Sequence, residues 1–290
     1  MIGLDLAWGT RATTGACALS ISLRAGAVCN LVSVREDLFD DDEILAWISS
    51  MCAKWGGAGV MLAVDAPLCV PNTTGDRPCD NETRRRFSRY HAGPHPANRN
   101  LLGDDPRGER LVRLLGSQGF RLDATLHDPR TNPGRIVFEV FPHPAHIVLF
   151  GRNKIIPYKA KSGRSPESRA AAMLEYGDLL RRLCRGERTW FAGEAQDTDR
   201  AESMPLIDLP EGWPLLSDAI TDLDIGGVDK PYPHYTSLPR GGRLKKYEDG
   251  LDALTCALVA YWYWWNGPVG VEVLGDPTAG HIVVPRIPKR

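Results

Sequence analysis

The chain has 290 residues, of which 43% are hydrophobic and 24% charged, so it can bury a full core. Its 35 basic and 36 acidic residues leave a net charge of −1, which neither attracts nor excludes a polyanion. Seven scattered cysteines without a C-x-x-C pair argue against zinc and against a disulfide framework, and no apolar run is long enough to cross a bilayer. We expect a cytoplasmic protein without a membrane partner, and its oligomeric state is left open.

The first 68 residues read as a three-stranded antiparallel meander, a helix and a buried strand. The expected elements are strands at 2–8, 16–23, 27–36 and 59–68 and a helix at 43–55. A right-handed crossover places the last of these strands parallel to the first and beside it. Asp5 lies in the first strand and Asp65 at the corresponding end of the other, so the two carboxylates should meet at one edge of the sheet.

The next segment, residues 69–134, is rich in Pro, Gly and Arg. Between residues 76 and 135, twelve arginines face eight acids, a local charge of +4. We interpret 69–134 as an Arg-rich insertion that contains a short helix at 108–119 and lies as a lid beside the acidic edge. A strand at 135–143 follows it and carries Glu139 among apolar residues.

Residues 151–243 are interpreted as a second insertion, helical and irregular. Its stretch from 151 to 190 holds ten Lys or Arg against four acids. The helices expected in it lie at 166–184 and 214–221. The last helix, at 245–265, carries Asp249 and Asp252 three residues apart and therefore on one face. A hairpin of strands 269–276 and 280–285 closes the chain. Together these elements predict one α/β domain: a mixed five-stranded sheet, order 3-2-1-4-5, with helices on both faces.

Four segments thus bring acids to one edge of the sheet. The catalytic candidates are Asp5, Asp65, Glu139, Asp249 and Asp252. Clustered carboxylates repel one another unless a divalent cation neutralises them, and all-oxygen ligands favour Mg²⁺ or Mn²⁺. We expect Asp5, Asp65, Glu139 and Asp252 to bind the metal. Two ions about 4 Å apart would support phosphodiester hydrolysis, and the arginines would hold the phosphates.

Structural roles compete with each of these assignments. Asp5 could bond to the Gly9-Thr10 turn, Asp65 could cap a turn, and Asp249 and Asp252 could be favourable charges at a helix N-terminus. Glu139 could be the buried ion-pair partner of an insertion arginine, and His143 a general acid or, preferably, a core histidine. The candidates for substrate contact are Arg77, Arg84, Arg85, His91, His95, Asn98, His143 and Lys159. For most of them the alternative is a solvent-exposed helix face or loop, which would show the same residues in the sequence.

The motifs GLDLAWG, VDAPL, RPCDNETRR, EVFPHPA, YK and DGLDAL resemble a bacterial and archaeal family called domain of unknown function 429, which is predicted to contain RNase H-like nucleases. GLDLAWGTRATTGACAL also resembles the first hairpin of RuvC-type nucleases, and EDGLDALTCAL their final acidic helix. The resemblance implies one RNase H-like domain over residues 1–290, a nuclease using Mg²⁺ or Mn²⁺, and a nucleic-acid partner, DNA or RNA. By it, Asp5, Asp65 and Asp252 are the acids of strand 1, strand 4 and the last helix. Asp249 is the extra helix acid, and Glu139 is a feature of the family with no counterpart in the better-known nucleases.

Two other functions remain open at this stage. Sugar kinases and actin-like ATPases also begin with an apolar strand, an Asp and a Gly/Thr turn, but they need a second phosphate turn, for which residues 224–227 (DIGG) are a weak candidate. A non-catalytic nucleic-acid-binding module is the third reading. The intact set of acids argues against it, because a groove that binds phosphates gains nothing from central carboxylates.

Overall fold

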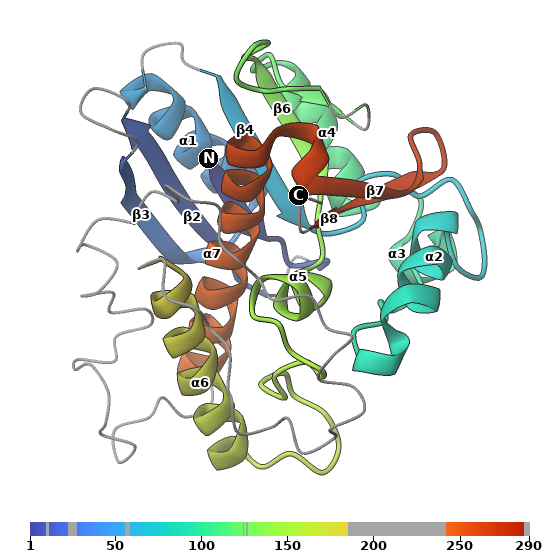
Figure 1. The fold of residues 1–290 in the computed structure, drawn as a ribbon. Helices are drawn as coiled ribbons and strands as arrows, with labels where there is room; N and C mark the ends of the chain where they lie inside the picture. The colour runs from blue at the N-terminus through green and yellow to red at the C-terminus, as the bar shows by residue number, and fades with distance from the viewer. Residues whose placement is uncertain are drawn as a thin grey trace.

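The structure, a computed structural model, describes residues 1–9, 12–22, 28–55, 59–123, 125, 127–184 and 242–286. A mixed sheet forms its centre, in the order β3-β2-β1-β4-β6-β5 (Figure 1). The strands are β1 (Ile2–Asp5), β2 (Thr14–Ser22), β3 (Val28–Leu38), β4 (Val60–Asp65), β5 (Arg121–Leu122) and β6 (Arg135–Glu139). The first three form an antiparallel meander, and β4, β6 and β5 extend the sheet in parallel from β1.

The order of the first five strands across the sheet confirms the predicted order 3-2-1-4-5, in which the fifth predicted strand is β6. The predicted number of five is wrong, because β5 pairs with the outer side of β6. Two residues are too few to produce a pattern of alternating hydrophobicity, which is why this strand is invisible in the sequence. β1 and β6 are shorter than expected, and each ends at its acidic residue.

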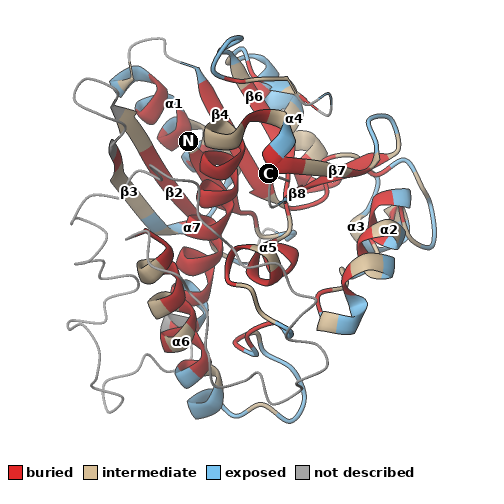
Figure 2. Cartoon of the chain, viewed as in Figure 1, coloured by how far each residue is buried: buried red, intermediate tan, exposed pale blue. Residues whose placement is uncertain are grey.

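Helices cover both faces of the sheet, as predicted. On one face lie α1 (Asp41–Lys54) and α4 (Arg107–Gly116); on the other lie α5 (Pro142–Leu149), α6 (Pro166–Cys184) and α7 (Gly242–Asn266). The bounds predicted for α6 are confirmed, and α7 begins three residues before the predicted helix. Figure 2 shows α7 buried along most of its length, because it lies between the sheet and α6.

The insertion at 69–134 has two packing partners. Its first helices are α2 (Pro78–Phe87), η1 (Ser88–Tyr90) and α3 (Arg99–Leu102). Of these, α2 packs against the C-terminal hairpin of β7 (Val271–Asp276) and β8 (Gly280–Pro285), which follows η4 (Gly267–Gly270). By contrast, α4 packs on the sheet beside α1. The segment is therefore partly a component of the core and cannot be a lid as a whole.

The closing hairpin is confirmed at the predicted place, and a bridge between Val140 and Val283 ties it to the end of β6. The helix expected at 214–221 and the DIGG turn at 224–227 lie outside the described residues. All seven cysteines are free thiols. Among the described helices, none combines the length and apolar character that a membrane span requires.

Candidate metal centre and cleft

Two neighbouring strand ends position the first pair of acids. β1 and β4 run parallel in a register that sets Asp5 directly beside Asp65. Each acid is the last residue of its strand, where the side chain leaves the apolar interior of the sheet. The expectation that a right-handed crossover brings these carboxylates together is thereby confirmed.

The third acid comes from α7, which lies unusually close to the first hairpin. A Cβ atom on Gly3 would lie 2.1 Å from the carbonyl oxygen of Ala253, and one on Gly15 would lie 2.1 Å from that of Asp249. Only glycine at these two positions lets the helix backbone rest directly on the strands. This close approach places Asp252 over the ends of β1 and β4.

Asp5, Asp65 and Asp252 form a group that could hold a metal ion, and we call it the acidic triad. One carboxylate oxygen from each lies within 4.8 Å of the others. Six-coordinate Mg²⁺ sets opposite oxygens about 4 Å apart, so the spacing is close to what a single ion requires. Oδ2 of Asp5 is buried and accepts no hydrogen bond from any part of the chain that the structure describes. The donor set and this unsatisfied oxygen both fit a hard divalent cation.

Burial and mutual repulsion make the triad costly to ionise without a cation. Burial is the largest cause that raises the pKa of Asp5, and it raises the pKa of Asp65 well above its usual range. The charge of Asp252 raises both further, whereas the Lys159 ammonium opposes the rise. Cation binding at this position would therefore release protons.

Asp252 is held by three side chains. Its Oδ1 accepts hydrogen bonds from the Tyr158 hydroxyl at 2.7 Å and from the Tyr176 hydroxyl at 3.2 Å. Its Oδ2 lies 2.8 Å from Nζ of Lys159. Burial alone would lower the pKa of Lys159, but the charges of Asp252, Asp5 and Asp65 raise it well above its usual value. The lysine predicted to contact substrate is therefore a charged member of the acidic site.

Asp249 lies beside the triad but has its own cation. It accepts a hydrogen bond from the Thr13 hydroxyl at 3.2 Å and forms an ion pair with Lys245. Burial, followed by repulsion from Asp5, raises the pKa of Asp249 to about 8. Asp249 therefore lies at the edge of the acidic triad, where its charge and that of Asp5 repel each other.

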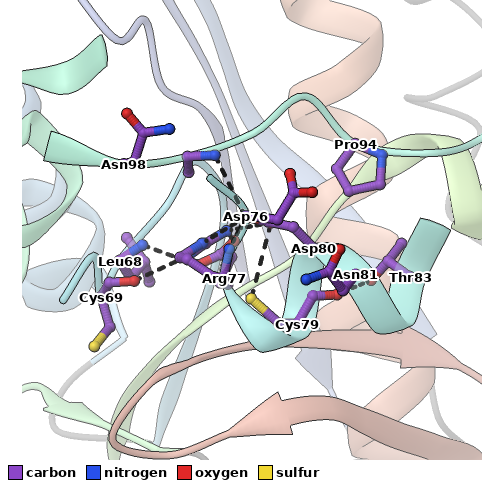
Figure 3. Close-up of polar contacts among 12 residues, drawn as sticks. Leu68, Cys69, Asp76, Arg77, Cys79, Asp80, Asn81, Thr83, Pro94 and Asn98 are labelled. Atoms are coloured by element: carbon purple, nitrogen blue, oxygen red, sulfur yellow. Dashed lines mark hydrogen bonds and ion pairs between the residues drawn. The ribbon is translucent and has the colours of Figure 1, made fainter. Parts of the chain in front are cut away.

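Glu139, which was predicted to bind the metal, pairs with an arginine in the structure. It accepts two hydrogen bonds from the Arg77 guanidinium, at 2.6 and 2.9 Å, and one from the Leu68 backbone N–H at 2.9 Å. Arg77 also pairs with Asp80 at 2.8 Å, and Figure 3 shows the guanidinium between Leu68 and Cys69 on one side and Asp80 on the other. Arg77 and Glu139 thus form the buried ion pair that was the alternative reading of Glu139.

Other predicted contact residues are distributed unevenly. Arg84 pairs with Asp76 at 2.5 Å, and Arg85 is exposed on α2. Asn98 caps α3 by accepting from the Leu101 N–H, and His91 ends η1 with φ of 63°. None of these four lines the cleft described below. Most arginines of the insertion already have carboxylate partners; these are Arg77, Arg84, Arg86, Arg99, Arg107, Arg110, Arg113 and Arg130.

A cleft of about 380 Å³ opens beside the triad and is lined by Asp5, Asp65 and Glu139 among others. Four residues of the predicted substrate-contact set line it too: Arg77, His95, His143 and Lys159. His143 is buried, and burial lowers its pKa well below the usual value, which agrees with the core reading. Its Nε2 accepts no hydrogen bond from the described residues.

Sequence reasoning missed several residues that line this cleft: Trp8, Lys161 and Lys245. The Trp8 side chain is 46% exposed, which is unusual for so large an apolar group. Its position three residues after Asp5, beyond the end of β1, was the one available signal. Lys161 and Lys245 gave no signal of their own, because other Lys and Arg residues lie close to each of them in the sequence.

The sequence model of the family described as Protein of unknown function (DUF429) matches residues 3–278. The chain belongs to the DUF429 family. No curated protein and no solved structure matches it.

In this DUF429 chain the matched range includes all three acids of the triad, the Tyr158-Lys159 pair and the Arg77–Glu139 contact. The match ends at residue 278, in the turn between β7 and β8. The candidate metal centre and its cleft thus lie almost wholly within the family's domain.

Proposed function

We propose that this DUF429 protein is an RNase H-like nuclease that hydrolyses phosphodiester bonds with Mg²⁺ or Mn²⁺ held by Asp5, Asp65 and Asp252. The observation that carries the proposal is the meeting of these carboxylates within 4.8 Å of one another, from two parallel strand ends and a helix. A sheet with its first strand central, and an acidic helix across it, agrees with what the RuvC-type resemblance implies.

The chemistry divides between the cation and the protein. When bound, such an ion supplies Lewis acidity and neutralises charge at the phosphate. Tyr158 and Tyr176 hold Asp252 in one orientation, so that the triad needs little rearrangement to accept an ion. Lys161, Lys245 and His95, all in the cleft wall, would bind the flanking phosphates.

The cleft favours a short segment of single strand as substrate. Its volume of about 380 Å³ lies near the lower end of ligand pockets, about 300–1,000 Å³. The exposed Trp8 ring in its wall would stack on one base, a contact worth about 1–3 kcal/mol. Trp8→Ala should therefore weaken the binding of a single strand about tenfold or more.

The test is cleavage of labelled single-stranded, duplex, hybrid and junction substrates in Mn²⁺, with an ATPase assay run beside it. Asp5→Asn and Asp65→Asn should each lower the cleavage rate by at least about a hundredfold, because either change removes a charged ligand. Asp37→Asn, a matched change at an exposed acid that pairs with Arg35, should leave the rate unchanged.

Two results would contradict the proposal. Cleavage that persists unchanged in Asp5→Asn would come from a contaminant or from another site. ATP turnover without cleavage of any substrate would favour the kinase or ATPase reading.

A further inference from the structure

The charged groups in and next to the acidic end of the cleft form three sets, defined by their ion-pair contacts. Glu139 and Asp80 share the buried guanidinium of Arg77. Asp249 and Glu248 share Lys245, and Glu248 also pairs with Arg169. The acidic triad forms the third set, with Lys159 as the cation paired with it. The first two sets thus have their own partners within the chain.

Lys159 belongs to the triad in position as well as charge. Its Nζ lies 2.8 Å from Oδ2 of Asp252, and its side chain is only 27% exposed. Its ammonium also lies 5.7 Å from the centre of the Tyr158 ring, a cation–π contact that helps to fix it. Oδ1 of Asp252 thus accepts hydrogen bonds and its Oδ2 faces the Lys159 ammonium as an ion pair. Oδ2 of Asp5 and Oδ2 of Asp252 are both buried and accept no hydrogen bond from the described chain.

These positions set the charge that a metal must balance. Three carboxylates and one ammonium carry a net charge of −2, which one divalent ion neutralises. Counting the triad and Lys159 alone, a second divalent ion would leave an excess of +2 beside an ammonium, and uncompensated buried charge is costly. The neighbouring set of Glu139, Asp80 and Arg77 carries −1 and would offset only part of that excess.

We propose that the triad binds a single divalent cation and that the Lys159 ammonium takes the place of the second ion of a two-ion site. This replaces the two-ion expectation drawn from the sequence. The number of ions follows from the charges and contacts of the chain alone. Only the further role of Lys159, stabilising negative charge on the phosphate, rests on the proposed nuclease function.

The experiment is calorimetric titration of the full-length, metal-free protein with Mn²⁺, with bound ions also counted by electron paramagnetic resonance. The wild type should bind one ion at the triad, and Asp5→Asn should abolish that binding. Lys159→Met keeps the length of the side chain but removes its charge. It should bind the first ion at least about tenfold more tightly, because an ammonium no longer repels it, and should admit a second ion.

Two further variants control for folding and for general charge. Lys159→Arg keeps the charge and should still bind one ion, so it remains informative if Lys159→Met fails to fold. Lys161→Met removes a charge from the cleft wall without touching the Asp252 contact, and should keep one ion with an affinity within about threefold of the wild type. Two ions in the wild type, or unchanged affinity in folded Lys159→Met, would overturn the inference.

The result also separates this inference from the proposed function. One bound ion with the expected Lys159 effect, but no cleavage of any nucleic acid, would support the inference and contradict the nuclease. Cleavage by a protein that binds two ions would support the nuclease and contradict the single-ion inference.

Discussion

At the scale of single residues, the contact between Arg77 and Glu139 is a buried ion pair in the wall of the cleft. The guanidinium is 2% exposed and donates to both Glu139 and Asp80. Arg77→Met would leave two carboxylates buried without a cation, which costs about 3–5 kcal/mol. We therefore expect a large loss in the free energy of unfolding, measured by denaturation in urea.

Arg85 on α2 provides the matched control, because its side chain is 74% exposed and its nearest carboxylate oxygen, on Glu82, is 3.9 Å away. Arg85→Met should change the free energy of unfolding by no more than about 0.5 kcal/mol. An Arg77→Met protein as stable as Arg85→Met would mean that the buried pair does not exist as described.

At the scale of elements, the packing of α7 on the first hairpin decides whether the triad forms. Gly15→Ala would place a Cβ 2.1 Å from the Asp249 carbonyl oxygen, so the helix must move away from β2. Such overpacking costs about 1–3 kcal/mol, and the movement would shift Asp252 relative to Asp5. We expect a lower melting temperature and a smaller rise of that temperature on adding Mn²⁺.

Gly9→Ala is the control for the effect of an added methyl group, since no heavy atom of the described residues, its chain neighbours aside, lies within 4 Å of its Cβ position. It should melt like the wild type and respond normally to Mn²⁺. A Gly15→Ala protein with a full Mn²⁺ response would show that the approach of α7 does not position the metal ligands.

At the scale of the whole molecule, buried histidines contribute a loss of stability in mild acid. Burial lowers the pKa of His146 to about 3, that of His281 to about 4 and that of His143 well below its usual value. In the unfolded chain they take up protons below about pH 6.5. Between these values the histidines bind more protons in the unfolded state than in the native state, so their contribution to stability falls as the pH drops below about 6.5.

His146 allows this acid sensitivity to be tested, because its ring is fully buried against Tyr176, with ring centres 4.4 Å apart. From pH 7 to pH 5 the wild type should lose about 2 kcal/mol through this residue alone. His146→Leu should lose less over the same range, by thermal or urea unfolding in EDTA. The carboxylates with raised pKa act in the opposite direction, but equally in both proteins. Equal losses would mean that His146 is protonated in the folded state.

The sequence by itself determined the arrangement of strands and the meeting of two acids. Alternating and continuous apolar runs mark β1 to β4, and the right-handed crossover then leaves one place for β4, next to β1. Asp5 and Asp65 follow from that step, since parallel strands in register end together. The helix at 166–184 and the closing hairpin were equally local features, because periodicity and turn residues lie within a few positions of one another.

Only the tertiary structure decided which charges meet. Glu139 pairs with Arg77, 62 positions away, and Lys159 pairs with Asp252, 93 positions away by sequence number. Acids inside apolar strands look alike in sequence, yet Glu139 pairs with a guanidinium whereas Asp5 and Asp65 join a group that could hold a metal ion. The exposure of Trp8 was decided in the same way. The physical reason is that local patterns determine secondary structure, whereas long-range packing selects the partner of each buried charge.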